Sequence, residues 1–64
     1  MLGMNAKKPY DFLNERRGKQ IKITLKDGSV IEGVLKSYDL HVNLLIEKDG
    51  KEVFVRGDSI MTVE

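Results

Sequence analysis

Two short clusters of polar and charged residues have types and spacing that could do chemistry: Asp39, His41 and Asn43 in one, and Arg56, Gly57 and Asp58 in the other. An imidazole ring and a guanidinium plane can stack on the two faces of a nucleic-acid base. A side-chain amide offers the edge of that base both a donor and an acceptor. Each cluster alone is also typical of an ordinary polar turn. If the fold brings the clusters together, they predict recognition of an unpaired base.

Catalysis has little support in the residues. A nucleophile needs a positioned base, and the only histidine, His41, would have to serve one of three serines, Ser29, Ser37 or Ser59. Most candidate carboxylates fall at expected turns, where turn chemistry explains an aspartate: Asp27, Asp39, Asp49 and Asp58. With no cysteine and one histidine, a zinc site has almost no ligands. We therefore expect no enzyme, no small-molecule substrate, no cofactor and no metal.

The chain has 64 residues, which is one small domain whose core barely offsets the entropy of ordering the chain. The absence of cysteine excludes disulfides and suits a reducing compartment. Oligomerisation is then the remaining way to add stability. The longest apolar run, Leu44–Ile46, is far shorter than the roughly 20 residues of a membrane span, so we expect a cytoplasmic protein with no membrane partner.

Charge is unevenly distributed along the chain. Residues 1–26 hold seven basic and two acidic residues, a balance of +5, whereas the whole chain carries only +1. Such a basic segment either attracts a polyanion or is simply a solvated face.

One short helix is expected near the start of the chain. Pro9 suits a first helical turn and Gly18 suits a stop, which predicts a helix over Pro9–Arg17. Residues 1–8 show no periodicity and are expected to be a flexible tail, so a single domain over 9–64 is predicted.

After this helix, apolar and polar residues alternate with the period of a β-strand. Five strands are expected: Ile21–Lys26, Ser29–Tyr38, His41–Glu47, Val53–Val55 and Ile60–Val63. Asp27-Gly28 between the first two is a strong hairpin signal. Five short antiparallel strands in about 55 residues predict a mainly β fold, either a strongly bent sheet or a small, partly open barrel.

The second strand is predicted to bend at Gly33, because an interior glycine often marks a bend or bulge. Simple alternation places three of its side chains on one face, Val30, Val34 and Tyr38, and Ile31 and Leu35 on the other.

Two segments, Asp39-Leu40-His41-Val42-Asn43 and Val55-Arg56-Gly57-Asp58-Ser59-Ile60, resemble the two signature segments of the Sm and Sm-like proteins. Pro9–Leu13 resembles the N-terminal helix of that family, and Lys26–Ser29 with Gly33 resembles its first hairpin and bent second strand. The resemblance implies the Sm-like fold, an SH3-type barrel of five bent antiparallel strands capped by a short helix.

The resemblance also implies a homo-oligomeric ring. In the family, the fourth strand of one subunit pairs with the fifth strand of its neighbour, which here assigns the interface to Val53, Phe54, Val55, Ile60, Met61, Thr62 and Val63. Seven subunits is the commoner number and six stays open. The short turn at Lys48–Lys51 and the end of the chain at Glu64 resemble archaeal members, whereas the bacterial branch has Lys-His where this chain has Arg56-Gly57.

Residue by residue, the resemblance implies that His41 and Arg56 stack on a base, Asn43 reads its edge and Asp39 shapes the loop. Gly57 would permit the turn, and Asp58 would order it or contact the nucleotide. The implied ligand is single-stranded, uridine-rich RNA at the inner rim of the ring, in RNA processing or metabolism.

The basic segment suggests a second RNA contact, made by Tyr10, Arg16, Arg17, Lys7 and Lys8. The alternative function is a small-barrel scaffold that binds proteins through its strand edges without recognising bases.

Overall fold

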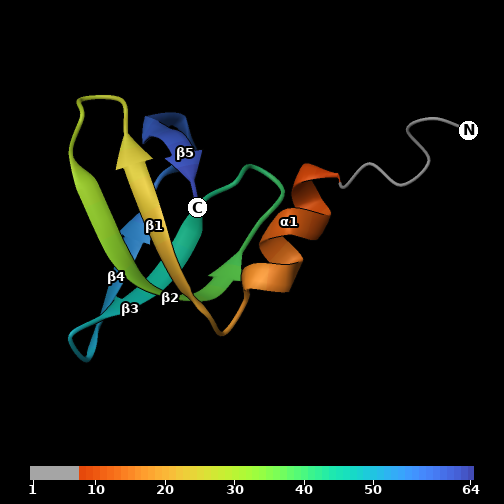
Figure 1. Cartoon of the computed structure of the whole chain (residues 1–64), viewed down its shortest axis with the longest axis horizontal. Coiled ribbons are helices and arrows are strands. Elements are labelled where there is room, and N and C mark those ends of the chain that lie inside the picture. Colours follow the sequence, from red (N-terminus) through yellow and green to blue (C-terminus); the bar gives the residue numbers. More distant parts are fainter. Residues whose placement is uncertain (1–7) are drawn as a thin grey trace, which may run out of the picture.

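The computed structural model describes residues 8–64, which form one short helix followed by five strands (Figure 1). The elements are α1 (Pro9–Arg16), β1 (Gln20–Leu25), β2 (Val30–Tyr38), β3 (Leu44–Lys48), β4 (Lys51–Val55), the 3-10 helix η1 (Gly57–Ser59) and β5 (Ile60–Val63). This order confirms the predicted mainly β fold. The division into a tail over 1–8 and a domain over 9–64 stays a prediction, because residues 1–7 lie outside the described part.

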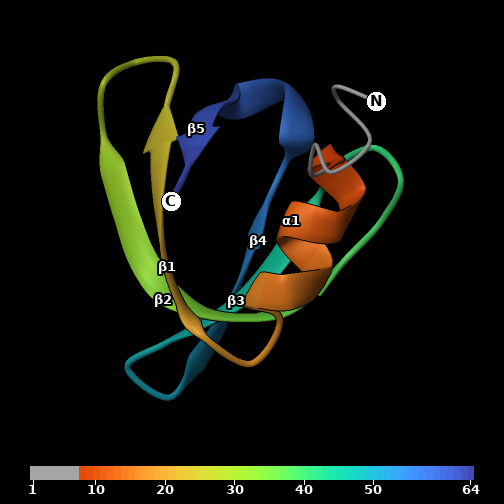
Figure 2. The same cartoon turned by 45° about the vertical axis from the view of Figure 1, so that its right-hand side comes forward.

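The five strands form one antiparallel sheet in the order β4-β3-β2-β1-β5. Figure 2 shows the sheet curling strongly from β4 at one end of this order to β5 at the other. Because the sheet does not close, each of these two strands has one edge without a strand partner within residues 8–64. The architecture is therefore the predicted bent sheet, an open barrel.

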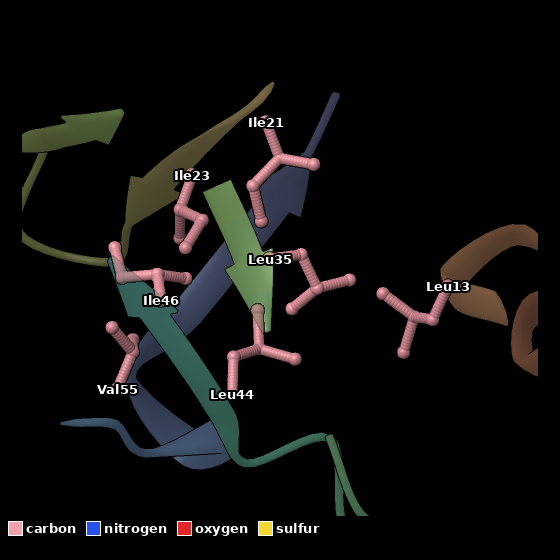
Figure 3. Packing of buried hydrophobic residues seen from close by; sticks show 7 residues of the cluster. All are labelled: Leu13, Ile21, Ile23, Leu35, Leu44, Ile46 and Val55. Carbon is pink, nitrogen blue, oxygen red and sulfur yellow. The ribbon is translucent and has the colours of Figure 1, made fainter. Parts of the chain in front are cut away.

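The core lies inside the curled sheet. Seven side chains, each at most 6% exposed, point toward one another from β1, β2, β3, β4 and α1 (Figure 3): Leu13, Ile21, Ile23, Leu35, Leu44, Ile46 and Val55. Leu13 comes from the helix and covers one end of the cluster. A small core of this kind is consistent with a need for further burial by assembly.

A pair of tyrosines joins α1 to β2. The Tyr38 hydroxyl donates to Oδ1 of Asn14 at 3.0 Å, and the Tyr10 ring meets the Tyr38 ring edge-on with centroids 5.4 Å apart. Loss of solvent around Tyr38 raises the pKa of its phenol. These contacts hold the helix beside the end of β2 that leads into the first polar cluster.

The face predicted for Tyr38 is wrong. The β2–β3 register shifts between Leu35 and Ser37, so Lys36 is an extra residue that reverses the alternation. Tyr38 consequently packs against the core rather than sharing the face of Val30 and Val34. Gly33 has another role: an added Cβ would come within 2.7 Å of the Glu47 carbonyl oxygen, so the absence of a side chain lets β3 approach β2 closely.

The predicted start of the third strand is also wrong. The structure begins β3 at Leu44, and His41 to Asn43 belong to the loop before it. Val42 has a φ of 62°, a left-handed conformation outside the β region of regular strands. Among residues 8–64, no helix is long and apolar enough to cross a membrane.

Candidate nucleic-acid interface

The two polar clusters lie side by side, although twelve residues, 44–55, separate them in sequence. The backbone N–H of Gly57 donates to Oδ1 of Asn43 at 2.8 Å, which connects the loop before β3 to the end of β4. A Cβ at position 57 would overlap the His41 carbonyl oxygen and lie 2.8 Å from that of Val42. Only glycine therefore permits this close approach of the two backbones.

Asp39 organises the first loop. Its Oδ1 accepts the backbone N–H groups of His41 at 2.9 Å and Asn43 at 3.0 Å, and its Oδ2 accepts from the Asn43 amide at 3.1 Å. These hydrogen bonds, those from Asn43 first, lower the pKa of the Asp39 carboxyl. The carboxylate is thus an acceptor for a loop that would otherwise leave several donors without a protein partner.

The amide of Asn43 already connects the two clusters. It donates one N–H to Asp39 and accepts from Gly57, which leaves its second N–H and a second acceptor position for a ligand. Sequence reasoning assigned Asn43 only to a base edge. Its structural role could not be predicted locally, because its partner at Gly57 comes from a distant part of the chain.

His41 and Arg56 are both exposed on this pair of loops. The His41 backbone is held by Asp39, while the residue itself is exposed. Nη2 of Arg56 lies 3.2 Å from Oδ2 of Asp58, and the side chains of this ion pair are 71% and 67% exposed. Such a pair contributes little to stability, so the guanidinium is free to exchange Asp58 for a ligand. Two planar groups therefore project from adjoining loops, next to an amide with unused hydrogen-bonding capacity.

The residues of the suggested second contact are only partly available. The Arg16 guanidinium lies 4.2 Å from the centre of the Phe12 ring, and Tyr10 packs on Tyr38 while keeping 53% of its surface exposed. Arg17 and Lys8 are exposed. Lys7 lies outside the described residues.

The predicted interface residues divide into three groups. Phe54 on β4 and Met61 on β5 are 62% and 60% exposed, and Thr62 is exposed as well. Val53, Ile60 and Val63 are half-buried and pack against the core, and Val55 belongs to the core itself.

Sequence reasoning missed a groove of about 620 Å³ between α1 and β5. The groove is lined by residues at the start of the helix and within it, in the two polar loops and on β5: Lys8, Pro9, Phe12, Leu13, His41, Val42, Gly57, Ile60, Met61 and Val63. Most of these side chains are apolar. Within residues 8–64, no three potential ligands from histidine, cysteine, aspartate and glutamate gather to hold a metal ion.

Comparisons with known proteins agree with this geometry. The LSM domain model matches residues 11–64. A putative snRNP Sm-like protein of Methanococcoides burtonii is 33% identical over 88% of this chain and 93% of its own length. A heptameric archaeal Sm protein is 35% identical with a TM-score of 0.72, covering 81% of this chain and 91% of that chain.

A third relative, the Sm protein of Pyrococcus abyssii solved in complex with a uridine heptamer, is 25% identical with a TM-score of 0.81. The match covers 89% of this chain and 96% of the other. Family match, sequence identity and fold agree, and the chain therefore belongs to the LSM domain family of Sm and Sm-like proteins.

Proposed function

We propose that this protein is a homo-oligomeric ring that binds single-stranded, uridine-rich RNA at its inner rim and acts in RNA processing or metabolism. The observation that carries the proposal is the hydrogen-bonded path from Asp39 through Asn43 to Gly57. This path holds the loop of His41 against the loop of Arg56, so that two exposed planar groups lie on adjoining loops. The arrangement suits binding of a base rather than catalysis.

The base site is proposed to work by stacking and edge recognition. His41 and Arg56 stack on a base, and the free N–H and acceptor of Asn43 read its edge. Asp39 and Gly57 maintain the loop geometry, and Asp58 holds Arg56 until a base arrives. The Pyrococcus abyssii relative, solved with a uridine heptamer, supports uridine as the preferred base.

Ring formation is proposed to use the two unpaired edges of the sheet. Pairing of β4 with β5 of the next subunit would supply each edge with a strand and cover Phe54 and Met61. The heptameric archaeal relative supports seven subunits rather than six.

Native mass spectrometry tests both parts of the proposal. The purified chain is mixed with equal amounts of uridine-rich and cytidine-rich oligonucleotides. We expect a closed ring, of seven subunits, carrying mainly the uridine-rich strand. A ring that carries neither strand would favour the protein-binding scaffold, which the exposed apolar side chains on both edges would also suit. A monomer would contradict the ring.

A further inference from the structure

The base site and the unpaired edge of β5 share the groove beside α1. His41, Val42 and Gly57 form one part of its lining, and Ile60, Met61 and Val63 of β5 form another. Anything that fills the groove from the side of β5 therefore contacts the loop that carries His41. This sharing links two features that the proposed function treats separately.

Val42 is the strained member of the shared lining. A φ of 62° is unfavourable for a β-branched residue, so its surroundings must hold this conformation. On one side they do: the Val42 N–H donates to the Asp39 carbonyl at 3.0 Å, and the Gly57 backbone packs closely against the Val42 carbonyl. On the other side the residue is 38% exposed and lines the open groove. In a single chain the strained loop is thus supported only from one side.

The unpaired strand that fits beside this groove is β4 of a second copy. The edge of β5 lies at the groove, and β4 has the only other strand edge left open within residues 8–64. Its Phe54 is a large apolar side chain that gains burial by docking. A strand added to β5 at this edge extends the sheet on the side of β5 that faces away from β1, where β5 lines the groove.

We propose that β4 of a second copy closes this groove, covers Val42 and thereby fixes the His41 loop, so that each base site gains affinity when its neighbour docks. The inference rests on the proposed ring and goes beyond it, because it makes the neighbour a positioning partner of the site. By linkage, a bound base must then stabilise the interface by the same factor.

The effect must be separated from avidity, by which any ring binds a long RNA more tightly than a monomer does. Uridine monophosphate occupies one site and removes avidity. Two variants break the interface from opposite sides: Phe54→Glu places a carboxylate on β4, and Met61→Glu places one on β5. Each variant alone is expected to be a folded monomer that binds the nucleotide weakly.

Mixing the variants restores a single interface, because Met61→Glu keeps an intact β4 and Phe54→Glu keeps an intact β5 with its groove. Isotope-labelled Phe54→Glu is titrated with uridine monophosphate by NMR, with and without excess unlabelled Met61→Glu. We expect the affinity of the labelled chain to rise by about fivefold or more in the pair. Excess unlabelled Phe54→Glu is the matched control and should change nothing.

A pair that forms without a gain in affinity would overturn the inference, as would a ring that persists in both variants. If the wild-type ring bound neither uridine monophosphate nor uridine-rich RNA, the proposed function would fail instead. Amide exchange then decides the inference separately: docking should slow exchange at Val42 and Asn43 in the labelled chain, and unchanged exchange would refute it.

Discussion

At the scale of single residues, Asp39 has an electrostatic role that can be measured. Hydrogen bonds from Asn43 and His41 lower its pKa from the ordinary value of 3.8. Since the folded pKa lies below the unfolded one, the ionised carboxylate stabilises the fold above about pH 4. This contribution is lost as the pH falls through the folded pKa. NMR titration of the carboxyl carbon should give a midpoint below 3.8, and Asn43→Ala should bring it closer to that value. An identical midpoint in the variant would contradict the assignment.

Gly57 tests whether the two loops must touch. Gly57→Ala should force the backbones of residues 41 and 57 apart and destabilise the fold by about 1–3 kcal/mol, with a loss of RNA affinity. Gly50→Ala is the comparison. Gly50 lies in the β3–β4 turn with a left-handed backbone, so an alanine there should cost about 1–2 kcal/mol of folding free energy, but its Cβ would contact nothing. Denaturant unfolding should therefore show similar losses of stability in the two variants. RNA titration should show weaker binding for Gly57→Ala but not for Gly50→Ala.

His41 and Arg56 carry the stacking prediction. Replacing either by alanine should cost about 1–3 kcal/mol of binding free energy per stacked base and leave the ring intact. Lys48→Ala removes an exposed positive charge on the β3–β4 hairpin and is the control for Arg56→Ala. Fluorescence titration with uridine-rich RNA checks the result, and unchanged affinity in both site variants would exclude the stacking site.

At the scale of elements, the sequence predicts most strands but not the irregular backbone within and between them. The alternation around Ile21 and Ile23 identifies β1, because each inward position is apolar. No local signal indicates the extra residue at Lys36 or the left-handed Val42, since contacts with β3 and with the Gly57 loop impose both. The site depends on these irregular positions, so the sequence could indicate which residues matter but not how they are held.

Helix α1 raises the question of a second RNA contact. Arg17 is exposed at the end of the helix, so Arg17→Glu changes charge without disturbing the stacking of Arg16 on Phe12. If Arg17 meets a phosphate, the slope of log affinity against log salt should become shallower by about 0.7. Lys48→Glu makes the same charge change on the β3–β4 hairpin and should leave the salt slope unaltered. An identical slope in Arg17→Glu would show that Arg17 meets no phosphate.

At the scale of the whole molecule, assembly should determine stability. Within residues 8–64, the core of one chain has seven buried side chains, while Phe54 and Met61 stay exposed on strands with an unpaired edge. A fold stabilised by its neighbours unfolds at a temperature that rises with protein concentration, because association favours the native state by mass action. Calorimetry over a hundredfold concentration range should show this rise. Phe54→Ser should lower Tm at each concentration. Val30→Thr replaces an apolar side chain that is 47% exposed on β2, the middle strand of the sheet, and should not. A Tm independent of concentration in the wild type would mean that the open edges remain unpaired and that the single chain is stable by itself.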